Sequence, residues 1–282
     1  PFVWSRNGGC HTVNSGNWGY AYSVAEDYIF AGTDYSERDV PKAVIWGSSF
    51  PRPGLSRKVL QSGPSEALAI AKRNSSVVVG WANNSSGRRQ AVVWKHTGVR
   101  DTFPAVQYFL PYPSSWTLRG SAANAVSPNG RVILGNANGD IIDNSDPEFP
   151  SVTRVSAILV WRWDGQSPGT ITFEEIPTSP IAFTASTALG ITADGSRIVG
   201  YRNTSVGSGP NQRTEPRAAW WRKTSAGWVY ENLNQVFSNL IGTGSVLLVA
   251  NAISPDGRYI VGWGYNAARG RQEAFLLSLP CV

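Results

Sequence analysis

The sequence predicts an all-β fold, a five-bladed β-propeller of four-stranded antiparallel blades, with six blades as the alternative. One pattern of short β segments is repeated five times along the 282 residues. Glycine (29) and proline (18) are plentiful and charged residues make up only 16%, a composition typical of many short strands joined by turns. Sheets with apolar residues on both faces need neighbours to cover them, and radial repetition of such sheets is the architecture of a β-propeller.

Each repeat begins with a short strand that ends in an apolar residue, which we expect to be buried. These residues are Val24, Ile70, Val126, Ile191 and Ile253, at intervals too regular for chance. A turn follows each of them, and in the last three repeats the third turn residue is a glycine that can adopt positive φ. The first two repeats lack this glycine.

Three further strands complete the predicted blade. The second strand ends in glycine, at residues 29–32, 77–80, 132–135, 198–200 and 260–262. The third, often of the form Ala-x-x-Trp, covers residues 43–46, 91–94, 158–161, 218–221 and 274–277. We expect its tryptophans to pack in the core between blades rather than to bind sugars. A fourth strand is expected at residues 102–107, 170–175 and 228–232.

The two ends of the chain predict how the ring closes. Residues 2–4 and 10–13 read as two strands joined by a turn, whereas the last repeat lacks a fourth strand. We expect residues 10–13 to be the outer strand of the last blade, which would place Cys10 beside Cys281. A disulfide between them would close a loop of about 270 residues and stabilise the fold by roughly 4–5 kcal/mol on the chain-entropy model.

The five units resemble the short extracellular repeat named for its His-Ala-Phe triplet. In that repeat Ala-x-Ala-Ile-(Ser/Asn)-x-x-Gly-x-Ile-Val-Gly is followed by Ala-Phe-Leu-Trp, and residues 251–277 match it best. The units depart from it at the naming position, where Lys42, Gln90, Ser156, Arg217 and Glu273 stand in place of His. The resemblance implies a secreted β-propeller and carries no activity.

Several features favour secretion. The chain begins at Pro1 and contains no Met, which we interpret as a processed mature form. The terminal cysteine pair suits an oxidising compartment. Asn-x-Ser/Thr glycosylation acceptors occur in polar stretches, at Asn74, Asn83, Asn84 and Asn203. The sequence has no apolar run of the ~20 residues that span a bilayer, so we expect the protein to lie outside the membrane. We also expect residues 1–282 to form a single propeller domain and the protein to be a monomer.

The net charge of +6 favours an acidic partner, and a uronic-acid polysaccharide is the first candidate. The excess is carried by scattered arginines without a lysine-rich block, which makes nucleic acid a poor candidate. The loops after the second strands, residues 135–155 and 200–217, vary in length, as do the crossovers at 108–123 and 232–249. This uneven face predicts a single composite pocket rather than five equal ones.

Aromatic and arginine side chains of the variable face form the candidate site, because rings stack on sugars and guanidinium groups bind carboxylates. The expected catalytic residues are Tyr201, Arg202, Tyr265 and Arg269. The expected substrate-binding residues are Tyr35, Arg38, Trp81, Arg88, Asn136, Trp263 and Arg271. The arginines have an alternative role, which is to pair with acids of the same loops such as Asp34, Glu37, Asp39 and Glu215.

Three functions fit these residues. A polysaccharide lyase would neutralise the uronate with arginine and use tyrosine as the base for β-elimination. A glycoside hydrolase would need two facing carboxyls among the candidates Asp34, Asp39, Glu66, Asp140, Asp143, Asp146 and Glu148. A non-catalytic lectin would need neither. No cofactor is expected, although Asp140, Asp143 and Asp146 are of a type that holds Ca²⁺. With two histidines, His11 and His96, a zinc site is not expected.

Overall fold

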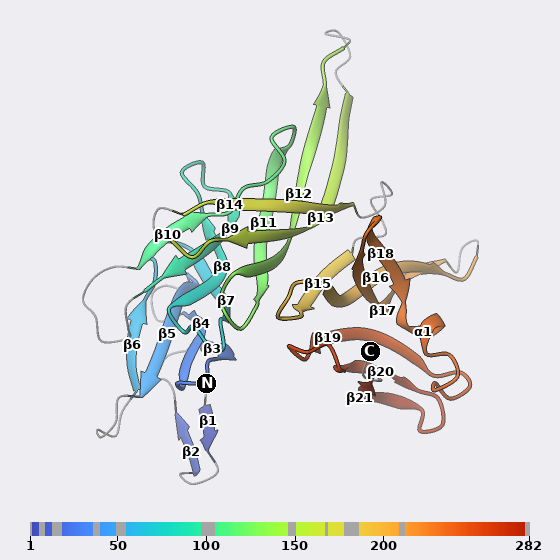
Figure 1. Ribbon diagram of the computed structural model, residues 1–282. Coiled ribbons are helices and arrows are strands. Elements are labelled where there is room, and N and C mark those ends of the chain that lie inside the picture. The colour runs from blue at the N-terminus through green and yellow to red at the C-terminus, as the bar shows by residue number, and fades with distance from the viewer. Residues whose placement is uncertain are drawn as a thin grey trace. The chain divides into compact units, whose positions relative to one another are not determined.

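The computed structural model describes residues 2–5, 9–12, 19–35, 40–48, 55–96, 105–145, 151–166, 169–177, 186–208 and 212–279. Its strands form five antiparallel sheets in chain order and one additional two-stranded hairpin (Figure 1). Four of the sheets have four strands each, and the last has three strands in the described part of the chain. The predicted class, an all-β five-bladed propeller, is confirmed.

The strands of each blade follow one another in the sheet in chain order. Blade 1 consists of β3 (Gly19–Val24), β4 (Ile29–Asp34), β5 (Lys42–Ser48) and β6 (Leu55–Val59). Blade 2 consists of β7 (Ser65–Ile70), β8 (Val77–Asn83), β9 (Arg89–Lys95) and β10 (Val106–Phe109). Blade 3 consists of β11 (Thr117–Val126), β12 (Val132–Asp143), β13 (Ser151–Trp163) and β14 (Ile171–Pro177). Blade 4 consists of β15 (Ser186–Ile191), β16 (Arg197–Val206), β17 (Arg213–Thr224) and β18 (Gly227–Asn232). Blade 5 consists of β19 (Val246–Ile253), β20 (Tyr259–Asn266) and β21 (Arg271–Ser278).

The chain divides into two compact units, and each is described by itself. The first contains residues 1–111, 119–133 and 163–171, and the second contains 112–118, 134–162 and 172–282. In the first unit, blades 1 and 2 share a core that includes Ile45 and Trp94. In the second, blades 4 and 5 share a core that includes Trp220 and Leu277. Neighbouring blades within a unit thus cover each other, and the third-strand tryptophans are buried as predicted.

A bulge in the first strand explains the glycine of the second strand. β7 is irregular between Ala67 and Ala69, and the Glu66 carbonyl lies where a β-carbon of Gly80 would be. The glycines at 32, 200 and 262 face first-strand carbonyls in the same way. The prediction that the second strand ends at this glycine is wrong, because the strand continues past the bulge in each of these blades.

Two predicted variable loops are β structure. Residues 135–155 belong largely to β12 and β13, which run as a long ribbon in Figure 1. Residues 200–217 belong largely to β16 and β17, whose pairing continues from Tyr201↔Ala218 to Val206↔Arg213. In each case the second and third strands of the blade continue as a two-stranded ribbon after the other strands have ended. Successive side chains of such a ribbon point to opposite faces, which suits the sequences of both pairs.

The first-strand anchors end β3, β7, β11, β15 and β19 as predicted, but their burial differs. Ile70, Ile191 and Ile253 are buried. Val24 is 44% exposed, contrary to the prediction, because every second residue of β3 faces solvent. The outer strands also differ: β10 begins at Val106, later than predicted, and β6 was not predicted at all.

In the first blade, the turn between the first and second strands contains a residue in a backbone conformation that normally requires glycine. Gly130, Gly195 and Gly257 have φ of 77°, 72° and 73°, and Tyr28 holds the matching place with φ 62°. A side chain in this left-handed region costs about 1 kcal/mol, and Tyr28 is 65% exposed and so contributes little packing.

We expect Tyr28→Gly to raise the free energy of unfolding by about 1 kcal/mol, measured by urea denaturation. Tyr28→Ala is the control, because it removes the ring and keeps the β-carbon that causes the strain. Equal stability of the two variants would show that the turn is not strained.

The N-terminal strands form their own hairpin. β1 (Phe2–Ser5) pairs with β2 (Gly9–Thr12), from Phe2↔Thr12 to Ser5↔Gly9. The prediction that residues 10–13 form the outer strand of the last blade is therefore wrong, since a short turn makes local pairing cheap in loop-closure entropy. Cys281 and the side chain of Cys10 lie outside the described part, so the disulfide remains a prediction. No helix of the described residues is long and apolar enough to cross a membrane.

Candidate functional site

The first unit brings aromatic side chains and a carboxylate together at one end of blades 1 and 2. Tyr20 pairs with Thr33 across β3 and β4, and Glu66 pairs with Trp81 across β7 and β8. Tyr35 follows directly after β4. Because β3 and β4 contact β7, these side chains gather beside the loops that join second strands to third strands. This is the end of the blades on which the sequence placed the site.

Glu66 is held by donors from two blades. The Tyr35 hydroxyl donates a hydrogen bond to Glu66 Oε1 at 3.2 Å, and Trp81 Nε1–H donates to Oε2 at 2.8 Å. The bond from Tyr35 crosses between blades, and the one from Trp81 lies within blade 2. An ionised carboxylate accepts about four hydrogen bonds, so Glu66 keeps acceptor positions for a ligand. Glu66 was considered from sequence only as a hydrolase acid.

Two exposed tyrosines extend from this carboxylate along β3. Tyr20 is 55% exposed and Tyr22 46% exposed. Their rings stack at 6.1 Å with an interplanar angle of 15°, and Tyr20 meets Tyr35 edge to face at 6.1 Å. We call Tyr20, Tyr22, Tyr35 and Glu66 the tyrosine surface. Sequence reasoning missed Tyr20 and Tyr22, although the spacing Tyr-Ala-Tyr in a strand places both rings on one face.

Tyr22 and Tyr35 of this surface are protonated donors. Burial, then the charge of Glu66 and the hydrogen bond to it, raises the pKa of Tyr35 to about 12. Burial and then Glu66 also raise the pKa of Tyr22. Neither phenol is therefore suited to remove a proton at neutral pH, whereas both can donate hydrogen bonds.

Trp81 contributes to the site by holding the Glu66 carboxylate in place. It is only 9% exposed, its indole N–H bonds to Glu66, and the guanidinium of Arg89 lies 4.3 Å from its ring centroid. A ligand therefore meets Glu66 rather than the face of Trp81. Of the other residues predicted near here, Arg38 lies outside the described part, and the Arg88 backbone N–H bonds to Asn84 Oδ1 at 3.0 Å.

The remaining predicted residues lie in the second unit. Tyr201 and Arg202 are in β16, and the Arg202 guanidinium lies 4.8 Å from the ring centroid of Tyr230. Asn136 bonds to the backbone of β15, donating to Ser186 O at 2.9 Å and accepting from Ala188 N at 3.1 Å. Its amide thereby joins blade 3 to blade 4. Trp263, in β20, pairs with Val249 and Ala274.

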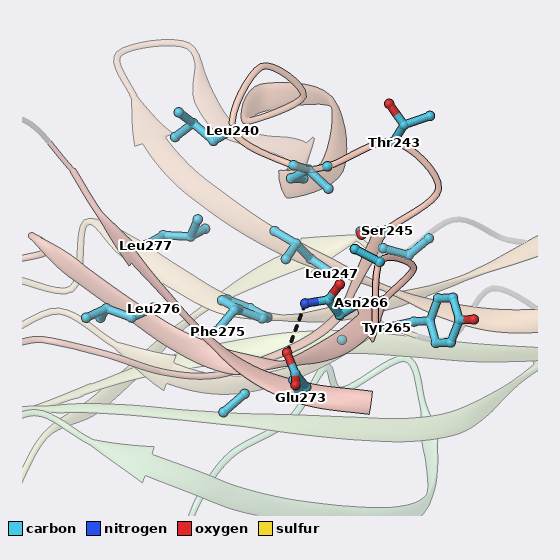
Figure 2. Close-up of a pocket in the computed structure, with 16 residues that line it drawn as sticks. Leu240, Thr243, Ser245, Leu247, Tyr265, Asn266, Glu273, Phe275, Leu276 and Leu277 are labelled. Carbon is cyan, nitrogen blue, oxygen red and sulfur yellow. Dashed lines mark hydrogen bonds between the residues drawn. The ribbon is translucent and has the colours of Figure 1, made fainter. Parts of the chain in front are cut away.

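A pocket in the last blade contains one of the predicted catalytic residues. It has a volume of about 380 Å³ and lies between β20–β21 and residues 240–247 (Figure 2). Leu247, Phe275 and Leu277 form an apolar wall, and Tyr265, 41% exposed, stands at one side of the view. Polar groups of Thr243, Ser245, Asn266 and Glu273 complete the lining, so the pocket combines an apolar wall with polar groups.

The charge of the pocket's carboxylate is satisfied internally. Glu273 accepts hydrogen bonds from Arg271 at 2.8 Å, from Asn266 at 2.9 Å and from Arg269 at 3.0 Å. These bonds, from Arg271 first, hold the pKa of Glu273 at about 2. Arg269 and Arg271 thus fill the alternative role, pairing with an acid of their own blade, as Arg213 and Arg217 do with Glu215.

Arg271→Gln is expected to raise the pKa of Glu273 from about 2 toward its ordinary range, measured by NMR titration of the carboxyl carbon. A carboxyl whose pKa is lower in the folded than in the unfolded protein stabilises the fold above the unfolded value. That stabilisation is lost as the pH falls through the folded value. In the variant the loss should therefore be smaller and should be complete at a higher pH. An unchanged Glu273 pKa would refute the assignment of Arg271.

The other candidate acids do not form a cluster in the described part of the chain. Asp34 is fully buried and pairs with Arg57 at 2.5 Å. Asp143 Oδ1 accepts from the backbone of Ser145, which lowers its pKa. No group of three His, Cys, Asp or Glu side chains that could hold a metal occurs among the described residues. Asp140 lies in β12. The candidates Asp39, Asp146 and Glu148 lie outside the described part, as does Glu37, which was expected as an arginine partner.

The glycosylation acceptors differ in accessibility. Asn74 is exposed, in the turn between β7 and β8, and Asn83 and Asn203 are half-buried. The Asn84 amide donates to Gln90 Oε1 at 3.0 Å, and its oxygen accepts from Ser86 N and Arg88 N. Asn74 is thus the acceptor whose position best suits a glycan.

Comparison with known proteins adds little on function. No family model matches the chain, and no curated protein matches it. A solved structure of a puromycin-hydrolyzing peptidase of Mycobacterium tuberculosis is similar with a TM-score of 0.46 and 13% sequence identity. The alignment covers 93% of this chain and 37% of that chain, so this chain spans little more than a third of the peptidase. A likeness at this level carries no argument about activity.

Proposed function

We propose that the protein binds carbohydrate through the tyrosine surface and does so without catalysis. The observation that carries this proposal is the placement of the exposed Tyr20 and Tyr22 rings beside Glu66. Aromatic rings offer apolar faces to the C–H groups of a sugar, and a carboxylate with spare acceptor positions takes hydroxyl protons. Because Tyr22 and Tyr35 stay protonated, they donate to sugar oxygens and do not act as bases.

The proposal also covers the type of repeat and the location of the protein. We take the protein to be a secreted propeller of His-Ala-Phe-type repeats. The support is the repeated (Val/Ile)-(Ser/Thr)-x-(Asn/Asp)-Gly sequence of the last three blades together with the exposed acceptor Asn74. The partner would then be an extracellular glycan.

A second candidate is β-elimination of a uronic-acid polymer at the last blade. It is favoured by Tyr265, which is 41% exposed at the pocket and in the same strand as Asn266, a hydrogen-bond partner of Glu273. It has less support, because Arg269 and Arg271 already pair with Glu273 and a substrate carboxylate would have to displace that bond.

One set of assays separates these functions. The protein is incubated with neutral, amino-sugar and uronic-acid oligosaccharides, and binding is followed by calorimetry together with absorbance near 235 nm and reducing ends. Binding without either product signal is expected. A rise at 235 nm would establish a lyase, new reducing ends alone would establish a hydrolase, and no binding to any of the three classes would refute the proposal.

A further inference from the structure

The tyrosine surface has a charge of its own that differs from that of the whole chain. Glu66 is the carboxylate to which Tyr35 and Trp81 donate, and its charge contributes to the raised pKa values of Tyr22 and Tyr35. A negative potential therefore extends over the tyrosine rings. The net charge of +6 is spread over 282 residues and is screened beyond about 8 Å at physiological salt. Local charge decides what this surface prefers.

The guanidinium groups of Arg89 and Arg57 each have a partner other than Glu66. Arg89 lies over the face of Trp81, whereas Glu66 meets the N–H at the edge of the same indole. Arg57 pairs with Asp34 at 2.5 Å, and that pair is neutral as a whole. Burial lowers the pKa of Arg89 and the charge of Glu66 opposes that shift, so these two charges interact. The hydrogen bonds that Glu66 accepts come from a hydroxyl and an indole N–H, which are neutral donors, so the carboxylate keeps its charge toward a ligand.

The rings favour the same sign of charge. The face of an aromatic ring is negative and attracts a cation within about 6 Å of the centroid, by about 0.5–1 kcal/mol at exposed sites. Tyr20 and Tyr22 expose half or nearly half of their surface. A protonated amine also donates three hydrogen bonds, which match the acceptor positions left on Glu66 and the phenol oxygens.

We propose that the tyrosine surface selects a sugar bearing a free protonated amine, a deacetylated amino sugar, over its N-acetylated form and over a uronic acid. This inference rests on the proposed carbohydrate binding and specifies its ligand class. The ammonium group would lie against Tyr20 and Tyr22 and donate to Glu66. A uronate would place its carboxylate beside Glu66 and be repelled.

The test compares chitosan oligosaccharides, chitin oligosaccharides and oligogalacturonates of equal length by calorimetry, at a mildly acidic pH where the amine is protonated. The chitosan ligand is expected to bind about tenfold more tightly than the chitin ligand, which corresponds to about 1.4 kcal/mol. Oligogalacturonate is expected to bind more weakly than either.

Glu66→Gln is the decisive variant, since glutamine keeps an acceptor oxygen for Trp81 and removes the charge. It should abolish the tenfold preference, because affinity for the chitosan ligand falls by more than affinity for the chitin ligand. Glu26→Gln is the matched control: it removes the same charge at the exposed pair with Arg73, in the turn at the other end of β3.

The outcomes separate the inference from the function on which it rests. Equal affinity for the chitosan and chitin ligands, or a preference that survives in Glu66→Gln, would overturn the inference and leave carbohydrate binding intact. Binding of none of the three ligands would overturn both.

Discussion

Gly80→Ala is expected to lower the free energy of unfolding by about 3 kcal/mol, the upper part of the range for overpacking. The added β-carbon would overlap the carbonyl oxygen of Glu66, which the bulge in β7 pushes toward β8. A backbone carbonyl in a hydrogen-bonded ladder cannot move aside as a flexible side chain can. The measurement is chemical denaturation with an unchanged m-value as the sign that the fold is retained.

Gly63→Ala is the control for this prediction. A β-carbon on Gly63 would have only Gln61 Nε2 within 4 Å, at 3.8 Å, so the change should stay within about 0.5 kcal/mol. If Gly80→Ala proved as mild as Gly63→Ala, the explanation of the repeated glycine by the bulge would fail. Gly80→Ala should also disturb the position of the Glu66 carboxylate, because the displaced carbonyl belongs to the same residue.

Replacing Tyr20 and Tyr22 together by alanine is expected to weaken carbohydrate binding about 30-fold. Each ring contributes about 1 kcal/mol of aromatic contact, and about 2 kcal/mol corresponds to this factor. Both side chains are largely exposed, so the free energy of unfolding should change little. Binding is measured by calorimetry with the tightest ligand of the panel.

Tyr259→Ala is the matched control for the double variant. Tyr259, in the second unit, is 40% exposed at the start of β20, and the guanidinium of Arg258 lies 5.6 Å from its ring centroid. It should bind as the unaltered protein does. Equal losses in the control and the double variant would mean that exposed aromatic residues in general, and not this arrangement, hold the ligand.

Much of the fold could be predicted because it is written as local repeats. The anchors from Val24 to Ile253 end the five first strands, and the third-strand tryptophans are buried. What the sequence could not indicate is where strands continue past the repeat. The bulge that explains Gly80 depends on a register between two strands, and the ribbon of β16 and β17 continues through residues that read as a polar loop.

The candidate site was predictable only in part. Tyr35 and Trp81 were selected because they follow the glycine at which each second strand was expected to end, and the structure joins them through Glu66. That junction combines residues of two blades, so chain spacing could not reveal it. The role of the arginines could not be read from their number, because Arg269 and Arg271 pair with Glu273, the alternative that the sequence had left open.

The central claim is that ligand binds beside Glu66, and the indole N–H resonance of Trp81 tests it most directly, since that proton is donated to Glu66. Titration of isotope-labelled protein with chitosan oligosaccharide should shift this resonance in proportion to occupancy, with the indole of Trp228 in blade 4 unmoved. Saturable binding that leaves the Trp81 resonance in place while others shift would contradict the account.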